Sequence, residues 1–172
     1  GSISILDKTH DVGTLLLTGP KSDALFSKLT NQELDQNNFP WLSHKIINVS
    51  GKECRVIKVS YAGEKGFEIH AINKFIPEIY REIINYGKQF SLIHFGMLAL
   101  DSMRLEKNYR SWKSDLTSDY SLLQSGLERW INFKKETFIG KEALEKEKRV
   151  GLTSHFITIV LDDPKDEQPF GE

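Results

Sequence analysis

The stretch WLSHKIINVSGKECRVIKVSYAGEKGFEIHA, residues 41–71, decides the fold class. Two runs rich in β-branched residues, 41–49 and 54–61, flank Ser50-Gly51-Lys52, and such a short glycine-containing link is typical of a hairpin turn. A loop with two glycines, residues 61–66, then leads into another short apolar run at 67–71. The stretch therefore predicts consecutive antiparallel strands.

Helical patterns lie on both sides of these strands. Upstream, a short apolar run at 15–17 predicts a strand, and Pro20 follows where it can open a helix with an apolar stripe at 24–29. Downstream, Phe75, Ile79 and Ile83 recur every four residues, which predicts an amphipathic helix. The order strand, helix, hairpin, strand, helix predicts an α+β fold, a ferredoxin-like antiparallel sheet with helices on one face.

The remainder of the chain does not fit that unit. We expect residues 3–95 to form the ferredoxin-like domain and residues 96–148 to form a helical extension, with helices near 96–107 and 141–148. The run 156–161 predicts a strand, and one strand cannot close a sheet alone. Residues 149–172 are therefore expected to begin a further, truncated domain. Gly1-Ser2 is interpreted as a tag remnant, and the chain as a piece of a longer protein.

Composition excludes several function classes. The 172 residues carry 23 Lys and Arg against 24 Asp and Glu, a net charge of −1, which argues against a nucleic-acid or membrane-surface partner. No apolar run reaches the roughly 18 residues of a membrane helix. Cys54 is the single cysteine, which favours a reducing compartment, the cytoplasm or a mitochondrial matrix. The five histidines lack ligand spacing, so no metal site is expected.

Residues 60–68 are the first candidate for chemistry. Gly63 and Gly66 allow a tight loop, with Tyr61 before it and Glu68 after it. A ring that stacks and a carboxylate that accepts two hydrogen bonds are suited to clamp a flat heterocycle with an amidine-like edge. On the residues alone, the alternative is a simple turn in which Glu68 is an exposed strand residue.

Residues 99–112 are the second candidate. Asp101 and Arg104 are three positions apart on a predicted helix and can pair on one face, which is also what a purely structural ion pair would require. Trp112 stands in a polar context, where it is interpreted as the wall of a ligand site or as an interface residue.

These motifs carry a family resemblance. Residues 59–70 resemble the S-Y-x-G-E-x-G-[FWY]-E-[LI]-H signature of the glycine-cleavage T-protein (aminomethyltransferase) family, and residues 99–110 resemble its A-x-D-S-[LM]-R-[LI]-E-K-G-Y-R. Further matches follow in the family's order, at 15–20, 39–44, 115–117, 126–127 and 138–144. Leu100 stands where the T-protein usually has Arg, and Asn108 replaces its usual Gly. Leu100 and the run FPWLSH at 39–44 are more similar to the folate domains of dimethylglycine and sarcosine dehydrogenases.

The resemblance implies a tetrahydrofolate site. In such enzymes a one-carbon unit from an N-methyl amine or an aminomethyl donor is transferred to tetrahydrofolate, giving 5,10-methylenetetrahydrofolate. Glu68 matches the glutamate that holds the pterin edge, Tyr61 a tyrosine beside the folate, and Trp112 an aromatic close to the pocket. Residues 96–148 would pack toward that pocket, and 149–172 would hold the first strand of a truncated C-terminal barrel.

The resemblance also implies what the chain lacks. The family's catalytic aspartate lies upstream of the motif at 15–20, so no catalytic residue is expected here and this piece alone should be inactive. Its partners would be folate and the missing N-terminal parts of the same protein, including an FAD domain if the parent is a dehydrogenase. Two alternatives remain open: a stand-alone T-protein, or a non-catalytic regulatory or binding module of the same fold.

Overall fold

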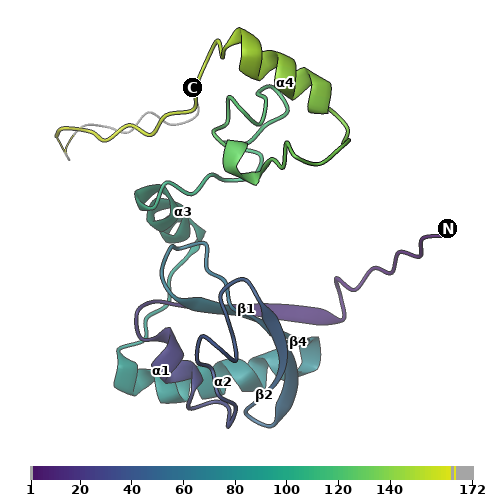
Figure 1. The fold of residues 1–172 in the computed structure, drawn as a ribbon. Coiled ribbons are helices and arrows are strands. Elements are labelled where there is room, and N and C mark those ends of the chain that lie inside the picture. Colours follow the sequence, from purple (N-terminus) through teal and green to yellow (C-terminus); the bar gives the residue numbers. More distant parts are fainter. Residues whose placement is uncertain (1, 164, 166–172) are drawn as a thin grey trace. The chain divides into compact units, whose positions relative to one another are not determined.

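The computed structural model describes residues 2–163 and 165. The chain divides into two compact units, Gly1–Tyr109 and Arg110–Glu172. Figure 1 labels most of the elements, which are β1 (Val12–Thr18), α1 (Ser22–Phe26), β2 (His44–Val49), β3 (Lys52–Ile57), β4 (Gly66–Ile72), η1 (Asn73–Phe75), α2 (Ile76–Gly87), η2 (Lys88–Phe90), α3 (Met97–Glu106), η3 (Glu128–Trp130) and α4 (Lys141–Val150).

The first unit contains a four-stranded sheet in the order β1-β4-β3-β2, and every neighbouring pair is antiparallel. The β2–β3 hairpin turns at Ser50 and Gly51, whose φ angles are 48° and 81°. Positive φ at both central residues gives a turn whose twist matches that of the flanking strands. The three later strands form a meander, and β1 joins it beside β4. The expected α+β class with an antiparallel sheet is confirmed.

Helices α1 and α2 cover one face of the sheet (Figure 1). Phe26 from α1 stacks on Phe67 from β4 with ring centroids 4.4 Å apart. Ile79 and Ile83 from α2 are buried in the same core, which confirms the apolar stripe predicted from their spacing. Because side chains alternate along a strand, Phe67, Ile69 and Ala71 of β4 point into this core.

The opposite face of the sheet, which we call the open face, carries the alternate residues. On β4 these are Glu68, His70 and Ile72, none of which is fully buried. Ile46 on β2 and Ile72 are about half exposed, at 49% and 53%. The fold therefore places Glu68 on the side of the sheet away from the helices.

Two features of the chain's later part bear on the expected domain bounds, which stay a prediction. Within the described residues the run 156–161 forms no strand, and the Phe156 amide donates to the Gln124 carbonyl at 2.8 Å. A strand needs a neighbouring strand, and none of the four described strands pairs with this run. The division into compact units falls after Tyr109, so α3 lies in the first unit. Gly1 of the expected tag remnant and residues 164 and 166–172 of the expected barrel lie outside the described residues.

Among the described residues, no helix combines the length and the apolar character that crossing a membrane requires.

Candidate functional site

The loop between β3 and β4 is fixed by Ser60 and Thr18. Ser60 is buried, its hydroxyl lies 2.7 Å from the Thr18 hydroxyl, and it accepts a hydrogen bond from the Ala62 amide at 3.3 Å. The Lys65 carbonyl accepts two bonds from the end of β1, from the Gly19 amide at 2.8 Å and the Thr18 hydroxyl at 3.1 Å. These bonds hold both ends of the loop against β1.

The two glycines of the loop are required by close approaches. Gly63 has a φ of +74°, and a Cβ there would lie 2.2 Å from Cγ of Lys107. A Cβ on Gly66 would lie 2.9 Å from the Leu17 carbonyl oxygen, which is backbone and cannot move aside cheaply. The two glycines therefore allow the loop to pack closely on β1 and on Lys107, the residue after α3.

Tyr61 faces a second tyrosine. Its ring lies 6.3 Å from that of Tyr109, with 22° between the planes. Tyr109 is held by Arg104, which is 4% exposed: the Tyr109 amide donates to the Arg104 carbonyl at 2.9 Å, and Nη1 of Arg104 donates to the Tyr109 carbonyl at 3.0 Å. Nε of Arg104 donates to Asp101 at 2.7 Å, which confirms the expected pair. That pair therefore fixes the turn that presents Tyr109 to Tyr61.

Glu68 lies on the open face between two aliphatic neighbours. Its cross-strand partners are Leu16 on β1 and Ile57 on β3. His70, two residues along β4, approaches the carboxylate with Nε2 at 3.3 Å from Oε2. Nδ1 of His70 lies 2.9 Å from the Thr14 hydroxyl on β1. Glu68 keeps 39% of its side chain exposed, so a ligand on the open face can reach it.

A hollow of about 460 Å³ lies on this open face. His70, Arg55 and Ile57 are among the residues that line it, together with Val12, Ile46 and Ile72. The hollow thus adjoins the histidine that contacts Glu68. Its lining combines cationic, acidic and aliphatic residues.

Trp112 belongs to the second unit. Its side chain is 77% exposed, at the start of a turn in which the Ser111 amide donates to Asp115 at 2.7 Å and the Lys113 amide to the Leu116 carbonyl at 3.1 Å. The assignment of Trp112 to the pocket stays a prediction, as do those of Tyr61 and Glu68. The structure places Tyr109 beside Tyr61 and His70 beside Glu68. Thr14 in turn lies beside His70. In the sequence, Glu68 and His70 are two positions apart in a predicted strand, and this spacing indicates that their side chains lie on the same face of the sheet.

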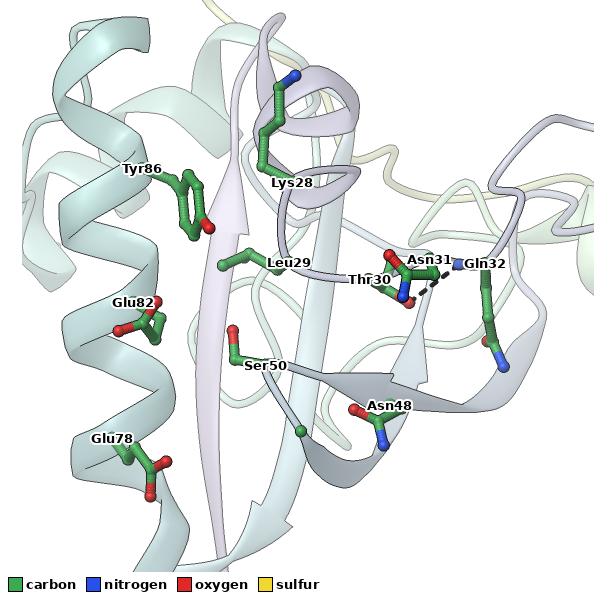
Figure 2. Close-up of a pocket in the computed structure, with 11 residues that line it drawn as sticks. Lys28, Leu29, Thr30, Asn31, Gln32, Asn48, Ser50, Glu78, Glu82 and Tyr86 are labelled. Carbon is green, nitrogen blue, oxygen red and sulfur yellow. Dashed lines mark hydrogen bonds between the residues drawn. The ribbon is translucent and has the colours of Figure 1, made fainter.

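A second, polar cleft of about 410 Å³ lies on the helix side of the same unit. Figure 2 shows Glu78, Glu82 and Tyr86 extending from α2 toward the segment that carries Leu29. Glu78 forms an ion pair with Lys52 at 2.9 Å. None of the predicted site residues lines this cleft, so it does not contribute to the heterocycle clamp.

The described residues also show how metal-ligand types of side chain and the cysteine thiol are placed. No group of three or more His, Cys, Asp or Glu side chains gathers there in a way that could hold a metal ion. Cys54 is 1% exposed, and burial raises the pKa of its thiol. This burial favours an inert core role for Cys54.

Comparison with known proteins gives matches over most of the chain. The model of the GCVT N-terminal domain family matches residues 2–135. Human mitochondrial sarcosine dehydrogenase is 32% identical over 160 residues, and mouse mitochondrial dimethylglycine dehydrogenase is 33% identical over 164 residues. An aminomethyltransferase of Thermoanaerobacter sp. (strain X514) is 32% identical over 161 residues.

These matches cover most of this chain but only a minor part of each relative. They include 92%, 94% and 94% of this chain, but only 17%, 19% and 44% of the respective relatives. The chain thus spans less than half the length of the relatives it matches.

Proposed function

This chain belongs to the GCVT N-terminal domain family, and from that premise we propose that it is the folate-binding part of an enzyme that transfers a one-carbon unit to tetrahydrofolate. The donor is an N-methyl amine of the dimethylglycine or sarcosine type, or an aminomethyl group, and the product is 5,10-methylenetetrahydrofolate. The relatives' names, two dehydrogenases and an aminomethyltransferase, support this class of reaction.

The single observation that carries the proposal is the placement of Glu68. Its carboxylate stands on the open face between aliphatic neighbours, accessible and held by His70. A carboxylate accepts two parallel hydrogen bonds from an edge that presents two N–H groups, as a pterin does. The Tyr61–Tyr109 pair supplies aromatic surface of the kind that contacts a flat ring. Trp112 is proposed as a further aromatic wall of the pocket.

The dehydrogenase type is the parent that we favour, with tetrahydrofolate bound here and FAD bound in another part of the parent protein. Leu100 and the FPWLSH run at 39–44 support it. The similar identities to dehydrogenases and to an aminomethyltransferase keep a stand-alone aminomethyltransferase as the second candidate. The third candidate is a non-catalytic binding module, and in that case even the whole parent protein would bind folate without turnover.

Catalysis in this proposal requires the rest of the parent protein. We assign no catalytic residue to this chain, and we expect the 172 residues alone to bind folate without turnover. The cytoplasm or a mitochondrial matrix is the proposed location, on the basis of the single cysteine and the mitochondrial names of two relatives.

Calorimetric titration with 5-formyltetrahydrofolate tests the proposal. Glu68→Ala should weaken binding by about tenfold or more, since hydrogen bonds to a charged group contribute roughly 1.5–3 kcal/mol. Glu142→Ala is the matched control, because Glu142 is an exposed carboxylate on α4, outside the sheet. Wild-type affinity in Glu68→Ala would contradict the pterin assignment, and absence of binding by the wild-type chain would contradict folate binding by this chain.

A further inference from the structure

Three side chains on the open face form a hydrogen-bonded row. The Thr14 hydroxyl on β1 lies 2.9 Å from Nδ1 of His70, and Nε2 of His70 lies 3.3 Å from Oε2 of Glu68. The sheet itself sets this row, because Thr14 and His70 are direct cross-strand partners and Glu68 and His70 are two apart on β4.

The direction of the hydrogen bonds follows from elimination. An ionised carboxylate only accepts hydrogen bonds, so Nε2 of His70 must carry the proton that points at Glu68. In the neutral ring Nδ1 is then an acceptor, and the Thr14 hydroxyl must donate to it. Glu68 therefore selects the ring form, and the Thr14 hydroxyl, which can donate, completes the row at Nδ1.

The other neighbours of Glu68 cannot replace His70. Leu16 and Ile57, its cross-strand partners, are aliphatic and donate nothing. Among the described residues Arg55, the cross-strand partner of His70 on β3, makes no hydrogen bond or ion pair with the carboxylate. Within the described residues, His70 is the side chain that makes a hydrogen bond to Glu68.

We propose that His70 is a positioning residue for folate recognition: it holds one oxygen of Glu68 so that the carboxylate is oriented before the pterin arrives. This inference rests on the proposed function. A carboxylate held by His70 loses less rotamer freedom when it binds a ligand, and this preorganisation strengthens binding. Each oxygen of Glu68 still has a lone pair for the ligand, because a carboxylate offers about four acceptor sites.

Four variants measured by titration with 5-formyltetrahydrofolate test the role. His70→Val removes the donor while keeping a strand-forming residue, and should weaken binding by roughly tenfold. His70→Gln carries an amide N–H at about the reach of Nε2 and should restore most of the affinity. His70→Asn carries the same amide closer to the backbone and should not. Thr14→Val should weaken binding by a few-fold.

His44→Val is the matched control, because His44 is an exposed histidine on β2, which is not adjacent to β4. It should bind like the wild-type chain. Thermal unfolding of every variant shows whether the fold is kept. A purely structural role for His70 would make Gln and Asn equivalent, and this result would overturn the proposal.

A second measurement needs no folate. In a two-bond ¹H–¹⁵N spectrum at pH above 8, the His70 ring should be protonated on Nε2 and bare on Nδ1, and Glu68→Ala, which removes the acceptor, should shift it toward a mixture of both forms. A ring protonated on Nδ1 in the wild-type chain would overturn the proposal.

The titrations separate failure of the positioning role from failure of the proposed function. If the wild-type chain binds folate and all His70 variants bind equally, only the positioning role fails. If the wild-type chain binds no folate, the proposed function fails and the positioning role falls with it.

Discussion

At the scale of the residue, Cys54 shows how burial controls reactivity. The thiol lies on the core side of β3 and is 1% exposed, and desolvation raises its pKa. Because the thiolate is the reactive form, both the raised pKa and the burial slow alkylation. At pH 8 we expect iodoacetamide to modify the native chain at least about tenfold more slowly than the urea-unfolded chain.

The unfolded chain is the control for that prediction, because it should take up one label per molecule at the rate of an ordinary thiol. Labelling of the native chain at the unfolded rate would contradict it. Such a result would mean that β3 opens to solvent far more often than a strand between two neighbours should.

The residues of the candidate site were predictable to different degrees. Tyr61 and Glu68 flank the two glycines of one short loop, so a local pattern was sufficient to select them. Thr14 lies 56 positions from His70, and their contact depends on the register of β1 with β4. Register is set by pairing of distant segments, which a single sequence does not display. Tyr109 was missed as a partner of Tyr61 for the same reason.

At the scale of the element, the turn before β2 depends on Asp35. Its carboxylate accepts bonds from the backbone amides of Asn37 at 2.7 Å and Asn38 at 3.1 Å, and from the Asn38 side chain. The side-chain bond from Asn38, followed by these amides, lowers the pKa of Asp35. The turn also presents Phe39, which is fully buried against Phe67.

This lowered pKa predicts a pH-dependent stability. A carboxyl whose folded pKa lies below its unfolded value of about 3.9 stabilises the fold above that value and loses this effect as pH falls through the folded pKa. Asp35→Ala should therefore lower the unfolding midpoint at pH 6, and the difference from wild type should shrink toward pH 2. Asp162→Ala, which removes an exposed carboxylate, is the control and should show no such trend. A difference that stays constant with pH would contradict the assignment.

Elements with strong local patterns were predicted well, and those that depend on neighbours were not. The Ser50-Gly51 hairpin and the apolar stripe of α2 each carry their own signal. The run 156–161 has an equally strong β-type composition, yet it forms no strand among the described residues. Strand propensity expresses how a side chain fits a pleated surface, so it has little effect where no sheet is present to receive it.

At the scale of the whole molecule, the two units differ in their apolar cores. Every member of the main core cluster lies between Leu17 and Ile83, and the segments packed against it end at Leu92. In the described residues of the second unit, Leu123 is the one apolar side chain that is buried, at 5% exposure. Burial of apolar surface is the dominant favourable term in folding, so the first unit should supply nearly all of the stability.

This difference predicts that the first unit folds alone. A chain ending at Tyr109 retains the sheet, α1, α2, α3 and the Arg104 contacts that hold Tyr109. It should unfold in one cooperative transition with a midpoint within a few degrees of the full chain, whereas residues 110–172 alone should show no cooperative transition by circular dichroism. Failure of the 1–109 chain to fold would contradict the prediction.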